Sequence, residues 1–121
     1  MTLTNLEFGT LSRAADQVTP AAQASTNTLT VVAGSALDAS VFGSLGYTMK
    51  NTGAQSINYE VWAGNASDFS DEVQIVSATT ILAGAAASYS VSPPPFRYYR
   101  VKEKSTVNDL HGAMTLRGVA R

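Results

Sequence analysis

Few side chains in this sequence could carry out chemistry. His111 is the only histidine, it lies beside Asp109, and the chain has no cysteine. A zinc site needs several His, Cys or acidic ligands, and a His–Asp pair needs a nucleophile to activate. No serine stands in a Gly-x-Ser-x-Gly motif, the usual setting of a hydrolase nucleophile. We therefore expect a non-enzymatic protein that uses no cofactor or metal.

One polar loop gathers acidic side chains. Asp68, Asp71 and Glu72 follow Asn65 closely in the sequence. Calcium takes six or more oxygen ligands, and a loop of acids can supply them. The spacing matches no calcium-loop signature, so a solvated turn is our main interpretation, and an ion site is the alternative.

Basic residues concentrate near the C-terminus. Residues 97–121 hold six basic side chains against two acidic ones, whereas residues 1–96 hold two against seven. Arg100, Lys102 and Lys104 alternate and so share one face of a predicted strand. That face is either solvated, protecting a sheet edge, or it docks on an acidic surface of a partner or of the next subunit. The net charge of −1 argues against nucleic acid as a partner.

The region 47–62 shows the clearest strand pattern. Side chains alternate with period two on both sides of residues 51–55, which predicts strands over about 45–51 and 56–63. Asn51 and Gly53 tolerate positive φ, so we expect these strands to form a β-hairpin. Tyr59 and Val61 should face the core, whereas Trp62 falls on the opposite face. Trp62 is then either a core residue in another register or an outward interface anchor.

Other short runs bounded by turn residues also predict strands. They lie at about 26–33, 72–77, 87–91, 96–104 and 112–120, with a possible edge strand near 41–42. About seven strands without any long helical period indicate an all-β protein: a single antiparallel β-sandwich of immunoglobulin-like type. A jelly roll or a small barrel is the structural alternative. The sandwich domain should cover residues 26–121.

Residues 1–25 differ from the rest and predict an N-terminal arm. Leu6, Phe8 and Leu11 are large apolar residues that precede the first predicted strand. They could anchor the arm on a partner, although a frayed terminus is the simpler interpretation. No apolar run is long enough to span a bilayer, and the first residues lack the pattern of a signal peptide. We therefore expect no membrane association and synthesis in a cytoplasm.

Taken as a series, four segments resemble small β-sandwich structural proteins encoded among the head and tail genes of tailed bacteriophages. The segments are YTMKNTGAQSINYEVW, LAGAAASYSV, PPPFRYYRVKEK and HGAMTLRGVA, and the resemblance covers about residues 26–120. It implies a virion protein made in the host bacterial cytoplasm, above all a decoration protein that stabilises the capsid. It also implies the major capsid protein or other virion subunits as partners, and a homo-oligomer, often a trimer. The alternatives are a tail or neck component and an immunoglobulin-like binding module, either an adhesin or carbohydrate-binding.

Overall fold

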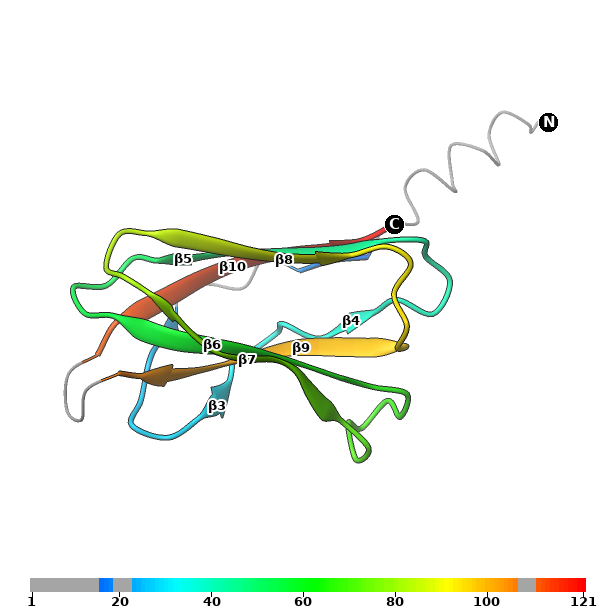
Figure 1. Cartoon of the computed structure of the whole chain (residues 1–121), viewed down its shortest axis with the longest axis horizontal. Coiled ribbons are helices and arrows are strands. Elements are labelled where there is room, and N and C mark those ends of the chain that lie inside the picture. The colour runs from blue at the N-terminus through cyan, green and yellow to red at the C-terminus, as the bar shows by residue number, and fades with distance from the viewer. Residues whose placement is uncertain (1–15, 19–22, 107–110) are drawn as a thin grey trace.

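Two antiparallel sheets packed face to face make up the fold (Figure 1). The computed structural model describes residues 16–18, 23–106 and 111–121, and these contain ten strands. The first sheet has the order β1 (Asp16–Val18), β10 (Ala113–Ala120), β5 (Leu45–Asn51), β8 (Ala86–Val91), and β2 (Gln23–Ala24) also pairs with β10. The second has the order β3 (Thr30–Val31), β9 (Tyr98–Ser105), β6 (Ile57–Gly64), β7 (Val73–Ile81), and β4 (Leu37–Asp38) also pairs with β9. The predicted all-β sandwich is confirmed.

The core lies between the sheets and follows the alternation of the sequence. In β6, Tyr59 and Val61 face inward with exposed fractions of 6% and 0%, whereas Trp62 points outward. The predicted register of this strand is therefore confirmed, and Trp62 is not a core residue. Strands β5 to β10 correspond to six of the seven predicted strands. The largest fully buried side chains come from both sheets and include Tyr47, Tyr99, Leu37, Met49, Ile57, Ile81, Met114 and Leu116.

The predicted hairpin over residues 45–63 is wrong. β5 pairs with β10 and β8 in the first sheet, whereas β6 pairs with β9 and β7 in the second. Residues 52–56 therefore carry the chain from one sheet to the other at one end of the sandwich (Figure 1). Asn and Gly suit a crossing as well as a hairpin turn, because both tolerate tight backbone conformations.

Asn51 holds this crossing together from inside. Its side chain is fully buried, and its Nδ2 donates to the carbonyl oxygens of Gln55, at 2.7 Å, and Ile81, at 3.0 Å. Its Oδ1 accepts from the backbone N–H of Gly53, at 3.0 Å, and Ala113, at 3.3 Å. One amide thereby joins the ends of β5, β7 and the start of β10, with every donor satisfied.

Gly53 is required by a close approach of backbone and not by a hairpin turn. A Cβ atom on Gly53 would lie 2.6 Å from the backbone of Gly112 and Ala113, a distance that real Cβ atoms do not show. The crossing thus packs directly against the start of β10. A side chain there would separate the two.

Side-chain hydrogen bonds shorten the strands before residue 45. The first predicted strand, 26–33, is reduced to β3, because Thr26 and Thr30 Oγ1 both donate to the carbonyl of Thr28 and form a local turn. The edge strand expected near 41–42 is absent from the described residues. Asp38 Oδ1 accepts from the N–H of Ser40 and ends β4 in a turn, which leaves Val41 81% exposed.

Part of the predicted arm belongs to the first sheet. Within residues 1–25, β1 and β2 pair with β10, and Ser25 is buried. Leu6, Phe8 and Leu11 lie outside the described residues, so their role as anchors stays a prediction.

Candidate functional site on the outer face of the second sheet

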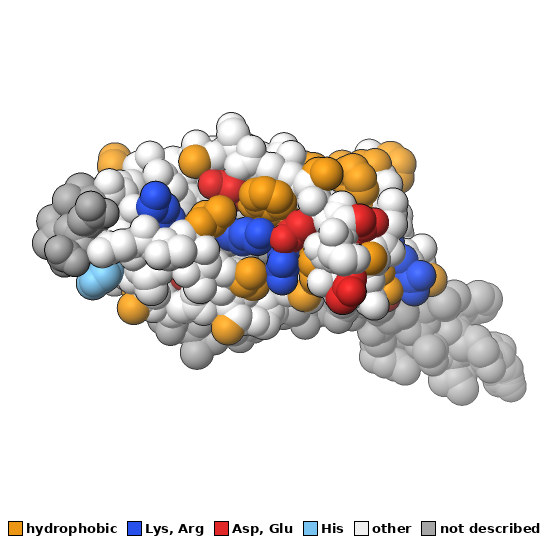
Figure 2. Space-filling model, turned by 90° about the horizontal axis from the view of Figure 1, so that it is seen from below, with side chains coloured by type: hydrophobic (Ala, Val, Ile, Leu, Met, Phe, Trp, Pro, Cys, Tyr) orange, Lys and Arg blue, Asp and Glu red, His pale blue; other side chains and the backbone are white. Residues whose placement is uncertain are grey.

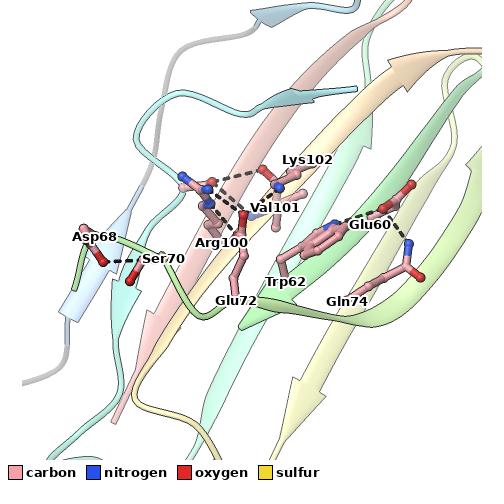
Figure 3. Close-up of polar contacts among 10 residues, drawn as sticks. Glu60, Trp62, Asp68, Ser70, Glu72, Gln74, Arg100, Val101 and Lys102 are labelled. Carbon is pink, nitrogen blue, oxygen red and sulfur yellow. Dashed lines mark hydrogen bonds and ion pairs between the residues drawn. The ribbon is translucent and has the colours of Figure 1, made fainter. Parts of the chain in front are cut away.

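The outer face of the second sheet carries a cluster of charged and aromatic side chains (Figure 2). We call it the outer-face cluster. Its members come from β6, β7, β9 and the 65–72 loop, and Figure 3 shows most of them side by side. They are Glu60, Trp62, Phe69, Glu72, Gln74, Arg100 and Lys102.

Glu72 is the centre of the ion pairs in this cluster. It accepts two hydrogen bonds from Arg100, Nε to Oε1 at 2.9 Å and Nη2 to Oε2 at 2.8 Å, and one from Lys102 Nζ at 2.8 Å. The hydrogen bond from Arg100 lowers the pKa of Glu72 most, and Lys102 lowers it further. Two cations of β9 are therefore held by one carboxylate of the same chain.

Aromatic rings cover both cations. Lys102 Nζ lies 4.0 Å from the centre of the Trp62 ring, and the Arg100 guanidinium lies 4.3 Å from the centre of the Phe69 ring. Phe69 reaches this position from a backbone with φ of 60°, which is uncommon for a residue with a side chain. The strained loop conformation is thus tied to the stacking.

Glu60 completes the cluster on the other side of Trp62. Its Oε1 accepts from Trp62 Nε1 at 2.9 Å and from Gln74 Nε2 at 2.6 Å. The indole has its N–H bonded and one ring face occupied by Lys102. Trp62 is therefore held against the surface of the second sheet by contacts within the same chain.

The structure brings together three of the predicted interaction residues, Trp62, Arg100 and Lys102, but not Lys104. The Arg100 and Lys102 side chains are only 23% and 15% exposed. Lys104 is exposed, and among the described residues it forms no ion pair. Two of the three residues of the predicted basic face are thus paired with a carboxylate of the same chain. Glu60, Phe69 and Gln74 could not be assigned to this face from the sequence. The pairing of β6 with β7 and β9 places Glu60 and Gln74 there, and the 65–72 loop places Phe69 there.

The acidic loop uses its carboxylates to shape itself. Asp71 accepts from the N–H groups of Asn65 and Ala66, and Asp68 accepts from the N–H of Ser70. The hydrogen bond to Ser70 lowers the pKa of Asp68. In the part of the chain that the structure describes, no group of three or more His, Asp or Glu side chains could hold a metal ion.

One carboxylate, that of Glu103, lies inside the molecule and not on the outer face. Glu103 of β9 points inward and is fully buried. Its Oε2 accepts from Gln23 Nε2 at 2.9 Å, and its Oε1 has no partner among the described residues. Burial raises the pKa of Glu103 to about 7, and the hydrogen bond from Gln23 opposes this shift. Glu103 was not singled out from the sequence.

The other candidate groups do not form a reactive centre among the described residues. His111 is exposed, and its Nδ1 lies 3.3 Å from Ser105 Oγ, whereas Asp109 lies outside the described residues. A shallow depression of about 340 Å³ on the outer face of the first sheet holds no acid or histidine among its lining residues, Thr48, Met49, Lys50, Thr52, Ala86, Thr115 and Arg117. No helix in the described chain is long and apolar enough to cross a membrane.

The fold is shared with solved structures of low sequence identity. The chain is similar to the SPBc2 prophage-derived protein YomS, with a TM-score of 0.54 and 12% identity over 88% of this chain and 91% of that one. A protein of the Bacillus endospore appendages, described as disulfide-linked pili, gives a TM-score of 0.49 at 10% identity over 88% and 86% of the two chains. That value is too low to support an argument. No family model matches the sequence, and no curated protein is similar to it. At this identity, the likeness to YomS shows a common fold.

Proposed function

We propose that this protein is a non-enzymatic structural component of a virion, specifically a decoration protein that binds capsid subunits of a tailed bacteriophage and stabilises the shell. It would act as a homo-oligomer on the major capsid protein. It would be made in the host cytoplasm and would need no cofactor.

The observation that carries this proposal is a long exposed segment without charge. Residues 73–96 contain no Asp, Glu, Lys or Arg, although most side chains of β7 and every second side chain of β8 are exposed. The centres of protein interfaces are depleted in charged residues, whereas the surface of an isolated domain normally carries many. The fold likeness to a prophage-derived protein supports the same proposal by analogy.

The outer-face cluster argues against the alternative of a carbohydrate-binding module. Such a module needs an aromatic ring that is free to stack on a sugar. The Trp62 ring is covered on one face by Lys102, and its N–H is bonded to Glu60. A tail or neck location is a variant of the same structural role, and the experiment below separates it from the head.

The test is to find the protein in purified particles. We expect it to remain with particles through a density gradient at many copies per particle, with immunogold labelling on heads. Particles made without its gene should form but break at lower temperature. Labelling confined to tails would assign it to the tail or neck, and its absence from purified particles would contradict the virion role.

A further inference from the structure

The two sides of the sandwich end in different kinds of strand. On one side the sheets end in the short strands β1, β3 and β4, which are two or three residues long. On the other side they end in β7 and β8, which are nine and six residues long (Figure 1). Short edge strands offer few unpaired backbone groups to another chain, whereas long ones offer a template for pairing.

Of the two long edges, β8 lacks the features that normally protect an edge strand. It contains no charged residue and no proline. It pairs with β5 over six consecutive residues without a break in register. β7, in contrast, has two irregularities where it pairs with residues 59–62 of β6. A bulge twists an edge away from an incoming strand, so β8 is the more accessible of the two.

The side chains along β8 are also suited to close contact. Ala86, Ser88 and Ser90 point outward and are exposed, and all three are small. Tyr89 points inward and is only half-buried, because nothing among the described residues continues the sheet beyond it. Leu82, in the turn between β7 and β8, is 64% exposed.

We propose that β8 pairs antiparallel with β8 of a second copy of this chain, so that the first sheets of two copies form one continuous sheet. The inference rests on the proposed function insofar as both take the protein to work inside an assembly. Its evidence is the edge itself. A twofold pairing gives two copies and not the three that the phage resemblance implies.

A second copy fits this edge better than an unrelated partner does. Antiparallel pairing of identical strands keeps outward residues opposite outward residues, for example Ala86 opposite Ser90 around a centre at Ser88. The half-buried faces, including Tyr89, then continue one another across the contact. Self-pairing places identical residues near each other, and like charges opposite one another are destabilising. Because β8 has no charge, it avoids this penalty, and it offers no charge that would select a partner of opposite sign.

Cysteine trapping tests the pairing, because the chain has no cysteine of its own. Ser88→Cys should form a disulfide-linked dimer rapidly under mild oxidation, since directly opposed residues of paired strands lie within disulfide reach. Thr48→Cys is the matched control: Thr48 is an exposed residue that pairs with Ser88 one strand further in. Ala86→Cys and Ser90→Cys serve to detect a shifted centre. If none of the three β8 variants crosslinks faster than Thr48→Cys, the pairing is wrong.

Sedimentation of the full chain gives a second readout. The wild type should sediment as a dimer at about 0.1 mM and dissociate on dilution, because an edge contact is small. Ser88→Lys should be a folded monomer, whereas Thr48→Lys should remain dimeric. A wild-type monomer or trimer would overturn the twofold pairing. So would a dimer that is lost when residues 1–15 are removed, because the occupant of the edge would then be that segment. If incorporation into particles persists while the purified chain is monomeric, this pairing fails and the proposed function stands.

Discussion

At the scale of single residues, two buried polar side chains join the sheets in different ways. Asn51 has partners for both of its donors and for its oxygen. Glu103 links β9 to Gln23 of β2 but leaves one oxygen without a partner among the described residues. A satisfied buried amide stabilises a unique arrangement, whereas an unsatisfied buried carboxyl costs free energy when it ionises.

Replacing Asn51 should therefore be costly. We expect Asn51→Ala to lower the free energy of unfolding by about 2–4 kcal/mol, because it removes the donor from the buried carbonyl of Ile81 and from the partly buried carbonyl of Gln55. Chemical denaturation followed by Trp62 fluorescence would measure the loss. Asn58→Ala, on the half-exposed outward face of β6, is the control and should change the free energy by much less. A loss below about 0.5 kcal/mol for Asn51→Ala would show that water replaces both bonds.

Glu103 should make the free energy of unfolding fall as the pH rises, whereas an acid in a salt bridge makes it increase. Its pKa is about 7 in the folded chain and near the ordinary 4.5 when unfolded. Below pH 4.5 Glu103 is protonated in both the folded and the unfolded chain, so its ionisation does not lower the free energy of unfolding. As the pH rises from 4.5 to 7 the unfolded state releases its proton first, so stability falls, by up to about 3 kcal/mol.

The test compares the wild type with Glu103→Gln, which keeps the shape but cannot ionise. The residues opposite Glu103 on the neighbouring strands are Tyr59 and Thr30, and its hydrogen-bond donor is Gln23, so none of these is an acid, Lys, Arg or His. His111, which contacts Ser105, is present in both proteins. We expect the variant to be the more stable at pH 8, with the difference shrinking toward pH 4. An identical pH profile for both proteins would mean that Glu103 is neutralised by another group.

At the scale of elements, β9 presents a different chemistry on each face. Its inward side chains include Tyr99, Val101 and Glu103, and its outward ones carry the positive charges. The 65–72 loop places Glu72 beside this outward face, where it accepts hydrogen bonds from Arg100 and Lys102. The loop therefore supplies the carboxylate that pairs with two of the three cations of β9, whereas Lys104 forms no ion pair among the described residues.

Lys102 and Lys104 should then behave differently when their charge is reversed. Lys102→Glu places two carboxylates together and should lower the free energy of unfolding by about 1–2 kcal/mol. Lys104→Glu should change it by less than about 0.5 kcal/mol. If a basic docking face exists, Lys104→Glu should weaken assembly in low salt even as a single substitution. Exposed charges act mainly on the rate of encounter, and salt screens them. Equal losses of stability at both positions would contradict the ion-pair arrangement.

At the scale of the whole molecule, the N-terminal residues help to close the sandwich. β1 pairs with one edge of β10, and Gln23 bonds both to Glu103 and to the backbone of Val31 and Ala33. The sandwich thus has one side closed by its own N-terminal segment and one side open at β8. Among the described residues, β8 is the one long edge strand whose pairing has no irregularity.

Two shortened chains separate the arm from the sandwich. A chain starting at Asp16 should melt at the temperature of the full chain, because it keeps β1, β2 and Gln23. A chain starting at Ala24 should melt several degrees lower, because it exposes the edge of β10 and leaves Glu103 without Gln23. Thermal melts of the full chain and the two shortened chains would measure these differences in melting temperature. Equal melting of all three chains would show that the segment before residue 24 contributes nothing to stability.

The sequence by itself determined where the six long strands lie and which way the side chains of β6 face. Alternation is a local property, so the inward Tyr59 and Val61 and the outward Trp62 could be predicted, as could all six long strands, β5 to β10. The same alternation also places Glu103 on the inward face of β9, a signal that could have revealed the buried carboxyl.

Only the tertiary structure decided which strands are neighbours. Pairing depends on contacts between residues far apart in the chain, and turn chemistry does not report it: the residues around Gly53 suit a hairpin and a crossing equally. For the same reason, the neutralisation of Arg100 by Glu72 and the position of β8 at an open edge could not be predicted. Arg100 and Glu72 are 28 residues apart, and the paired residues of β5 and β8 are further apart still, so no local pattern encodes either contact.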